Sequence, residues 1–439
     1  MIYAAALFII TYLLMLAFPK IRPKIVLLSA SLFILMGYAG FFPLDLQSAL
    51  KAVDYNVLLM IGGTMGIVSL FIESKMPLRL AEILITKVPN IQLAVTALAL
   101  FAGIISAFVD NVATVLMVAP IGLAISRKLR ISPVPVLIAI AVSSNLQGAA
   151  TLVGDTTSIL LGGFAQMSFF DFFWMQGKLG IFWAVELGAL ASMFILLFLF
   201  RKEKTPITAH VETHVEDGFP TQLLIMTVLL LIVASFLPMP ADPIVATLYS
   251  LRSGLICLTL CLIGVLRASF RTKSATPWKK LWKDLDKDTL LLLFGLFIVI
   301  EGIRSAGVID AIAQLFYHLA GDDPFLLYTL IVFASVILSA FIDNIPYVAT
   351  MLPVVQSIAA LMNQGAGIAP YVFYFGLLSG ATLGGNLTPI GASANITAIG
   401  ILRKNGEEVG LKDFLKIGIP FTLTAVSVGY IFIWFVWGV

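Results

Sequence analysis

Ser106-Ala107-Phe108-Val109-Asp110-Asn111 and Ser339-Ala340-Phe341-Ile342-Asp343-Asn344 are two copies of one hexapeptide, and they decide the fold of this chain. The sequences that follow are also alike, NVATVLMVAPIGLAI after Asp110 and NIPYVATMLPVVQSI after Asp343. Each copy places an Asp-Asn pair inside an apolar run, where a carboxylate is costly and usually marks an ion or substrate pathway. We therefore interpret the copies as the tips of two membrane hairpins that build one transport site between them.

The composition around these copies is that of a polytopic membrane protein. The chain has 439 residues, of which 60% are hydrophobic and only 12% are charged. A soluble protein of this size has too small an interior for so much apolar surface. The apolar runs do not alternate with polar residues, so we expect an all-α protein whose spans are helices rather than strands.

A span needs about 20 apolar residues, and the sequence predicts about ten spans. They lie near 2–18, 25–42, 55–73, 134–165, 179–200, 221–238, 251–266, 289–306, 369–401 and 418–438. Two of them, 134–165 and 369–401, are long and interrupted. Two further apolar pairs, 91–126 and 326–361, flank the hexapeptides. Each pair is either two ordinary spans or one re-entrant hairpin, and the Asp-Asn pair favours the hairpin, because two full spans would leave it in a surface turn.

The basic residues predict the orientation. Cytoplasmic loops collect Lys and Arg, so we place the PKIRPK loop, residues 19–24, in the cytoplasm. Of the 27 Lys and Arg, all but Lys51, Lys178, Arg252 and Arg304 then fall inside. This arrangement predicts a multi-pass protein of the cell (inner) membrane with both termini on the outer side. The hairpin 91–126 enters from the cytoplasm and the hairpin 326–361 from outside.

The two halves of the chain repeat. Residues 53–74 resemble residues 285–306, and Gly154 matches Gly391 after the two hexapeptides. Five spans per half would turn the second half upside down relative to the first. An inverted repeat with interrupted helices is typical of a secondary transporter with its site near the midplane. We expect repeat 1 in 1–205, a cytoplasmic linker in 206–220 and repeat 2 in 221–439, with Asp54 and Asp286 capping matching helices.

Each half also has a polar, glycine-rich break, SSNLQGAATLVGDTTS at 143–158 and SGATLGGNLTPIGASAN at 379–395. Irregular backbone at membrane depth survives where it lines a cavity, and its carbonyl and hydroxyl oxygens suit Na⁺. The alternative for the breaks is close helix packing by small residues. The alternative for Asp110 and Asp343 is N-capping of the second hairpin arm. The candidate ion- and substrate-binding residues are Asp110, Asn111, Asn145, Gly148, Thr151, Asp155, Thr156, Thr157, Asp343, Asn344, Asn386, Thr388, Gly391, Ser393 and Asn395, with Na⁺ near Asp110, Asn145, Asp343 and Asn386.

The segments SAFVDNVATVLMVAP, SAFIDNIPYVATMLP and GGNLTPIGASANITAIGILRKNG resemble the ion transporter superfamily. The branch they resemble holds the arsenite-efflux permeases, the NhaD-type Na⁺/H⁺ antiporters and the melanosomal P protein. The resemblance implies a scaffold and a transport domain, an elevator motion, a homodimer, and a site formed by the hairpin tips and the breaks. The more distant divalent anion:Na⁺ symporters carry Ser-Asn-Thr where this chain has Asp-Asn-Val and Asp-Asn-Ile, and this departure argues against a dicarboxylate substrate.

Charge then ranks the substrates. Asp110, Asp155 and Asp343 are candidate site carboxylates, and no Lys or Arg lies within either hairpin arm or either break. We therefore expect Na⁺/H⁺ antiport, with arsenite or antimonite efflux second and Na⁺-coupled anion or di- or tricarboxylate symport third. A channel is the alternative of another class, and hairpins entering from opposite faces suit alternating access better. The apolar spans hold no His and no suitable Cys, so we expect no enzyme, no cofactor beyond the coupling ion, and no partner besides lipid, the small substrate and a second copy of the chain; nucleic acid is excluded.

Overall fold

The computed structural model of the protein describes residues 1–129, 131–207, 213–215, 217–238, 240, 242–362 and 371–438. Parts of the predicted linker 206–220, the first two residues of the predicted interrupted span 369–401 and the last residue of the predicted second repeat lie outside the described residues.

The first half is built almost wholly of helices. They are α1 (Ile2–Ala17), η1 (Pro19–Ile21), α2 (Arg22–Tyr38), α3 (Leu46–Lys51), α4 (Tyr55–Glu73), α5 (Met76–Thr86), α6 (Ile91–Ser106), α7 (Asn111–Leu129), α8 (Pro133–Gly148), α9 (Thr156–Phe164), η2 (Phe170–Phe172) and α10 (Ile181–Leu199). One short antiparallel pair, β1 (Trp174–Met175) with β2 (Lys178–Leu179), precedes α10.

The second half continues with the same kind of elements. They are α11 (Phe219–Ser235), α12 (Pro243–Ser250), α13 (Arg252–Thr272), α14 (Thr276–Asp284), α15 (Lys287–Ser305), α16 (Val308–Ala320), α17 (Pro324–Ser339), α18 (Asn344–Met362), α19 (Tyr371–Gly384), η3 (Gly385–Leu387), α20 (Ser393–Lys404) and α21 (Leu411–Trp437). Every predicted span therefore coincides with a helix or with an interrupted helix pair.

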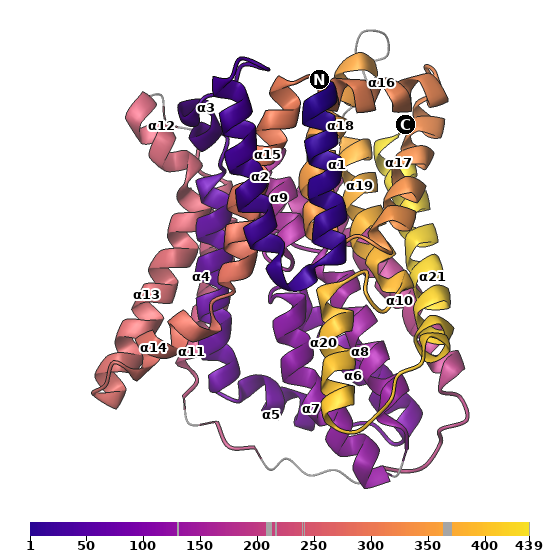
Figure 1. The fold of residues 1–439 in the computed structure, drawn as a ribbon. Helices are drawn as coiled ribbons and strands as arrows, with labels where there is room; N and C mark the ends of the chain where they lie inside the picture. Colours follow the sequence, from indigo (N-terminus) through magenta and orange to yellow (C-terminus); the bar gives the residue numbers. More distant parts are fainter. Residues whose placement is uncertain are drawn as a thin grey trace.

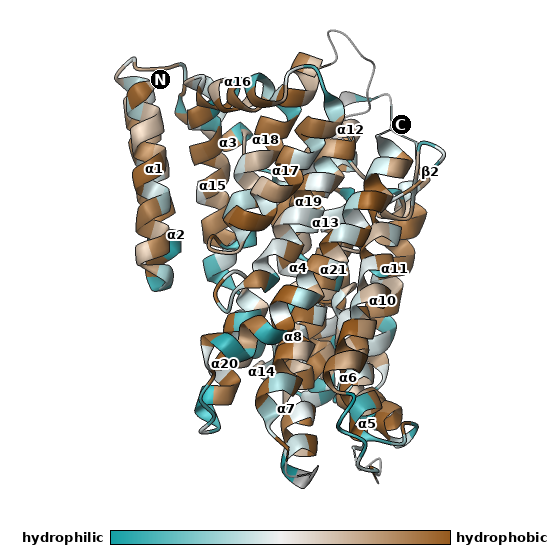
Figure 2. Cartoon of the chain, turned by 90° about the vertical axis from the view of Figure 1, so that its right-hand side faces the viewer, coloured by the Kyte–Doolittle hydropathy of each residue, from teal (hydrophilic) through white to brown (hydrophobic). Residues whose placement is uncertain are grey.

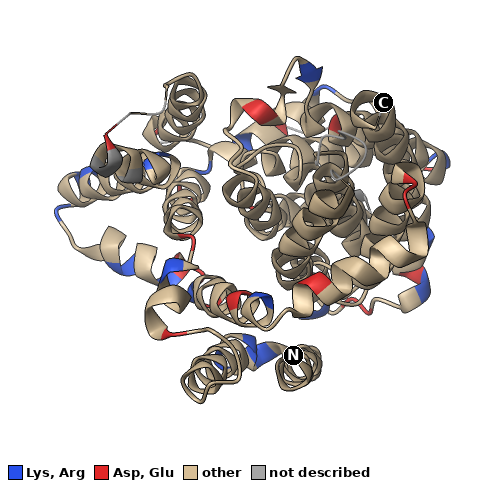
Figure 3. Ribbon diagram, turned by 90° about the horizontal axis from the view of Figure 1, so that it is seen from above, with Lys and Arg blue, Asp and Glu red and all other residues tan. Residues whose placement is uncertain are grey.

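Length and composition identify fewer complete spans than the sequence predicts. Within the described residues, 6 helices are long and apolar enough to cross a membrane, or 7 if α15 and α16, bent by 71°, form one span. The breaks divide two of the predicted spans into short helices, and α1 and α11 are just shorter than a full crossing. One of the 6 helices, α18, is an arm of the predicted hairpin 326–361 rather than a predicted span, so its length and composition also allow a full crossing there. Hydrophobic residues predominate along the helices (Figure 2), and charged residues are sparse among them when the molecule is seen from above (Figure 3). The chain is a multi-pass membrane protein.

The hairpins lie at opposite ends of the molecule. In Figure 1, α5, α6 and α7 occupy the lower part, whereas α16, α17 and α18 occupy the upper part, and both termini are at the upper end. Helices of the first half pack directly against helices of the second half: α2 against α15, α4 against α13, and α10 against α21. The two halves are thus interleaved, so a site at their boundary draws on both.

The predicted caps of matching helices are confirmed. The carboxylate of Asp54 accepts a hydrogen bond from the amide of Val57 at 3.0 Å, and that of Asp286 accepts one from the amide of Thr289 at 3.0 Å. These caps satisfy amides that a helix start leaves unpaired. They fix where α4 and α15, the two helices beside the hairpins, begin.

The helices that carry the polar breaks are the most deeply buried. Nearly every residue of α8 and of α19 is buried. Because these helices touch other helices on all sides, their polar residues meet protein rather than lipid. This placement agrees with the prediction that the breaks do not face the bilayer.

Candidate functional site

Both hairpin tips use their Asp as a helix cap. Oδ1 of Asp110 accepts hydrogen bonds from the amides of Val112 at 3.0 Å and Ala113 at 3.1 Å, at the start of α7. Oδ1 of Asp343 accepts from the amide of Ile345 at 3.3 Å, at the start of α18. Capping occupies only one oxygen of each carboxylate. The second oxygen of each Asp remains for another partner, and here the two tips differ.

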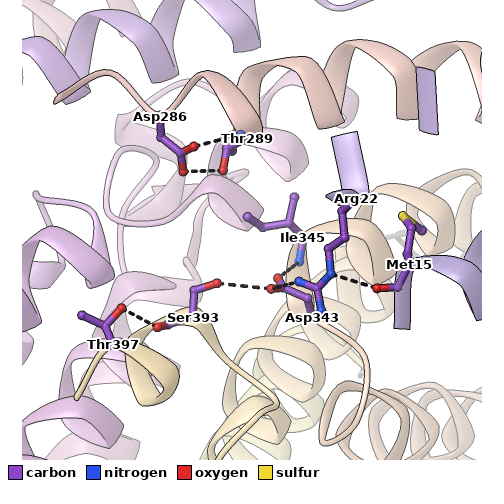
Figure 4. A network of polar contacts seen from close by, with 8 residues as sticks. All are labelled: Met15, Arg22, Asp286, Thr289, Asp343, Ile345, Ser393 and Thr397. Carbon is purple, nitrogen blue, oxygen red and sulfur yellow. Dashed lines mark hydrogen bonds and ion pairs between the residues drawn. The ribbon is translucent and has the colours of Figure 1, made fainter. Parts of the chain in front are cut away.

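Oδ2 of Asp343 is bound by a cation from elsewhere in the chain. Nη1 of Arg22 lies 3.0 Å from this oxygen, and the hydroxyl of Ser393 donates to it at 3.2 Å (Figure 4). The Arg22 side chain is 20% exposed and that of Asp343 is 7% exposed, so the pair is mostly shielded from water. The PKIRPK loop was expected to serve only as a cytoplasmic marker of orientation. The structure instead brings its Arg22 to the tip of the second hairpin.

The glycine-rich breaks are seated on the hairpin ends in the same way in both halves. A Cβ added to Gly154 would lie 2.6 Å from the carbonyl oxygen of Gly148 and 2.7 Å from those of Ala107 and Ser106. A Cβ added to the matching Gly391 would lie 2.6–2.9 Å from the carbonyl oxygens of Gly385, Ala340 and Ser339.

Each break is also hydrogen-bonded to its hairpin. The hydroxyl of Thr151 donates to the carbonyl of Ala107, and that of Thr388 donates to the carbonyl of Ala340. The tight fit and these hydrogen bonds attach each tip to the break of its own half. Close packing by small residues, the alternative for the breaks, is therefore part of what they do.

A network of buried amides joins the two breaks to each other. Nδ2 of Asn111 donates to Oδ1 of Asn145 at 3.1 Å. Nδ2 of Asn145 donates to Oδ1 of Asn386 at 3.1 Å and to the carbonyl of Thr382 at 2.7 Å. Nδ2 of Asn386 in turn donates to the carbonyl of Val142 at 2.8 Å. A buried amide is costly when unpaired, so this network holds the halves in register.

Asp155 is the third candidate carboxylate, and it occupies the N-cap position of α9. Within the described residues its side chain makes no capping hydrogen bond. Its Oδ2 accepts instead from the hydroxyl of Thr157 at 2.8 Å and from the amide of Asn344 at 3.3 Å. Asp155 and Thr157 come from the first half and Asn344 from the second, so candidate residues of both halves meet here.

A cavity of about 430 Å³ opens beside these groups. Six of the predicted residues line it, namely Asp110, Asn111, Asp155, Thr156, Asn344 and Ser393. The rest of the wall comes from α4, α7, α14, α15 and α18 and comprises Met65, Val68, Ser69, Ile72, Val112, Ala113, Leu116, Lys280, Asp284, Asp286, Thr289 and Ile345. The cavity is the space in which an ion or small solute would meet the tips of both hairpins.

The remaining predicted residues stand behind this wall. Asn145 and Asn386 form the amide network, and Thr157 supports Asp155. Asn395 donates to the carbonyls of Gly385 at 3.1 Å and Thr388 at 3.2 Å. Outside the cavity wall lie Asn145, Gly148, Thr151, Thr157, Asp343, Asn386, Thr388, Gly391 and Asn395. Of the four residues predicted near Na⁺, only Asp110 lines the cavity.

Sequence reasoning missed α14. The sequence predicts that the basic residues from 267 to 287 lie on the cytoplasmic side, but it does not predict α14. Residues 276–284 of this run form α14, and Lys280 and Asp284 of this helix reach the cavity. Nζ of Lys280 lies 3.2 Å from Glu73, and Oδ2 of Asp284 accepts from Ser69 at 2.6 Å. The available signal of an amphipathic helix was the i, i+3, i+4 spacing of Trp278, Leu281 and Trp282 among charged residues. Asp286, expected only as a cap, both caps α15 and lines the cavity (Figure 4).

Four carboxylates therefore face one ammonium group among the described residues of the cavity wall. The acids are Asp110, Asp155, Asp284 and Asp286, and the base is Lys280. No group of three or more His, Cys, Asp or Glu with metal-site geometry occurs in the described ranges of the chain. The described wall of the cavity therefore carries an excess of negative charge.

Known proteins are similar to this chain in sequence and in fold. The family model CitMHS, "Citrate transporter", matches residues 6–378. An uncharacterized transporter of Mycobacterium tuberculosis is 28% identical over 437 residues, which cover 99% of this chain and 98% of that protein. The human P protein is 25% identical over 473 residues, which cover 88% of this chain and 54% of the P protein. The crystal structure of the Alcanivorax borkumensis YdaH transporter has a TM-score of 0.58 at 15% identity, covering 92% of this chain and 88% of that one.

Proposed function

This chain belongs to the CitMHS citrate transporter family, and from that premise we propose that it is an alternating-access carrier that exchanges Na⁺ for H⁺ through the acidic cavity. Membership in the family makes the chain a secondary transporter and confirms the resemblance to the ion transporter superfamily and to the P protein. The substrate is the proposed part. An elevator motion and a homodimer belong to the proposal as well, carried by the resemblance alone.

The observation that carries the proposal is the charge of the cavity wall. Four carboxylates face one ammonium group there, and that ammonium group is held by Glu73 at 3.2 Å. In a cavity with low-dielectric walls, a surplus of negative charge attracts cations and repels anions. A tricarboxylate entering alone would meet like charges, whereas a monovalent cation would not.

The geometry supports separate roles for Asp110 and Asp155 in the proposed exchange. Asp110 holds the start of α7 with Oδ1, and its second oxygen is the one available to bind Na⁺ or a proton. Asp155 is steadied by Thr157 and Asn344, so its carboxylate keeps its position whether or not an ion is bound. A carboxylate oxygen binds Na⁺ only after it has released its proton. Competition of the two ions for the same oxygens couples their movement in opposite directions.

The position of the two hairpins at opposite ends of the molecule supports the proposal of alternating access. One hairpin comes from each end of the molecule, and each is attached to the break of its own half. A displacement of the hairpins and breaks together relative to α4 and α15 would carry the site from one face to the other. Carriers built from inverted repeats place their site at such an interface.

Na⁺-coupled uptake of a di- or tricarboxylate is the second candidate. Two observations favour it: the family is described as a citrate transporter family, and two cations, Arg22 and Lys280, lie at the site without belonging to a hairpin or break. For this function the cations would contact substrate carboxylates, and Na⁺ bound at the Asp residues would offset the remaining repulsion.

Proteoliposomes distinguish the two functions. The protein is reconstituted with a trapped pH-sensitive dye, and Na⁺, Li⁺, citrate, arsenite or chloride is added outside. We expect Na⁺ to enter in exchange for internal protons and to make the lumen more alkaline, with no response in protein-free liposomes. Proton movement with citrate or arsenite, and none with Na⁺ at any pH, would overturn the proposal.

A further inference from the structure

A second cavity, of about 260 Å³, shares α9 and α18 with the acidic cavity but touches both helices farther from their first residues. Its wall includes Ala52 and Asp54 before α4, the end of α9, the second half of α15 and the middle of α18. The proposed function makes no use of it.

The two cavities lie at opposite ends of the same helices. On α4, the acidic cavity touches Met65 to Ile72, and the second cavity touches Asp54 before the helix start. Asp54 and Ile72 are separated by about 27 Å of helix at 1.5 Å per residue, close to the thickness of a bilayer core. On α15, which is antiparallel to α4 in this region, Asp286 and Thr289 line the first cavity, whereas Glu301 and Arg304 line the second.

The layer between the cavities is one helical turn thick at its thinnest. On α9, Thr156 lines the acidic cavity and Leu160 lines the second one. On α18, Ile345 lines the acidic cavity and Ala349 lines the second one. Four residues of helix span about 6 Å. We call this layer, residues 157–159 of α9 and 346–348 of α18, the septum; all six residues are buried.

The second cavity carries the same sign of charge as the first. Among its described lining residues, Asp54 and Glu301 are acidic and Arg304 is basic, with Arg304 Nη1 3.9 Å from Glu301. Asp54 uses one oxygen to cap α4, while the other lies beside Gly163 in the cavity wall. A cation that leaves the acidic cavity across the septum therefore enters another region of excess negative charge.

We propose that the second cavity is the opposite-face half of the transport path and that the septum is its closed barrier in this structure. This inference rests on the proposed transport function but not on the identity of the ion. Solute reaches the hairpin tips from the acidic cavity, and it leaves through the second cavity once the septum has opened or the site has moved past it.

Cysteine accessibility tests this assignment. Cys257 and Cys261 are replaced by Ser, and a single Cys is introduced as Leu116→Cys in the acidic cavity, Ala349→Cys in the second cavity, or Ala359→Cys as a control. Ala359 lies on the same helix as Ala349 and is similarly buried, at 5% against 6% exposure, but it lines neither cavity. A membrane-impermeant thiol reagent is applied to one face of sealed vesicles at a time.

We expect Leu116→Cys to react from one face, Ala349→Cys to react from the opposite face, and Ala359→Cys to react from neither. Labelled Ala349→Cys should also lose transport, because the reagent fills the path. Reaction of Ala349→Cys from the same face as Leu116→Cys, or from no face, would overturn the inference even if transport is intact. If the two cysteines are labelled from opposite faces but the protein moves none of the tested ions, the assignment of the two cavities stands and the Na⁺/H⁺ proposal is wrong.

Discussion

Replacing Gly154 or Gly391 by alanine should displace the hairpin tip that packs against it, and the structure gives the size of the effect. In Gly154→Ala, the new Cβ would lie 2.6 Å from one backbone carbonyl oxygen and 2.7 Å from two others. Ordinary contacts between carbon and oxygen are several tenths of an ångström longer. Because all three oxygens belong to the backbone of α8 or the α6 end of the hairpin, none can move aside as a flexible side chain would. Overpacking of this kind costs about 1–3 kcal/mol.

The unfolded chain offsets part of this cost. Alanine restricts the unfolded state more than glycine and returns about 0.4–1 kcal/mol. We therefore expect Gly154→Ala to lose about 1.3 kcal/mol of stability. Gly391→Ala should lose slightly less, because its contacts are 2.6, 2.8 and 2.9 Å. Gly400→Ala in α20 is the matched control: a Cβ there would meet no atom of the described chain within 4 Å.

Thermal unfolding in detergent provides the assay, with Na⁺-driven proton movement in liposomes as a second readout. The expected order of melting temperature is Gly154→Ala lowest, Gly391→Ala next, wild type and Gly400→Ala highest. Transport should fall in the first two variants only. A wild-type melting temperature and wild-type transport in Gly154→Ala would refute the claim that the breaks pack tightly against the hairpin ends.

Three further predictions follow from the contacts. Arg22→Gln should lower stability by about 1.5–3 kcal/mol, the worth of a charged hydrogen bond, and adding Asp343→Asn should restore part of the melting temperature; no recovery would mean that the pair is incidental. Asn145→Ala should cost about 1–3 kcal/mol by leaving buried amides unpaired. The control is Ser143→Ala, because the hydroxyl of Ser143 is buried without a hydrogen-bond partner among the described residues, and this variant should melt like wild type. Equal losses of stability in the two variants would argue against the network. In the linker, burial raises the pKa of Asp217, but hydrogen bonds from Arg267 and the amide of Phe219 outweigh this effect and hold the pKa below 3.8. These contacts of Asp217 should persist above that pH and weaken as the pH falls through the lowered pKa. Proteolysis of the linker should therefore rise only in strong acid, and a rise already at pH 6 would contradict this.

Much of the site was predictable because its signals are local. A carboxylate in an apolar run and a glycine-rich break in a span both violate the rules for lipid-facing helices. Asp110, Asn111, Asp155, Thr156, Asn344 and Ser393 were found on such grounds, and the structure places all six at one cavity. Asp110 caps α7 with one oxygen and keeps the second oxygen uncommitted to the cap, so a capping role and an ion-binding role are compatible in this residue.

What could not be predicted depends on contacts distant in sequence. Arg22 is 321 residues from Asp343, and nothing in the PKIRPK loop marks it as a partner of a hairpin tip. Lys280 and Asp284 look like part of a basic loop until α14 folds against α4. Both omissions concern charge, and together they change the electrostatic argument: the site has basic neighbours, but they are bound to Asp343 and Glu73.

The two Asp residues of the tips consequently differ in role. Arg22 binds Asp343, which lies outside the acidic cavity wall, whereas Asp110 faces that cavity with one oxygen uncommitted to the cap. The proposed exchange should therefore depend more on the charge of Asp110 than on that of Asp343.

Na⁺-driven proton movement by Asp110→Asn in liposomes is the most direct test of the account. Asn is as good a helix cap as Asp, so this variant keeps the acceptor for Val112 and Ala113 and removes only the charge. Glu408→Gln, an exposed carboxylate far along the chain from the tips, is the control. We expect Asp110→Asn to melt like wild type and to lose Na⁺/H⁺ exchange, while Glu408→Gln keeps it. Exchange at the wild-type rate in Asp110→Asn would contradict the claim that this carboxylate carries the ions.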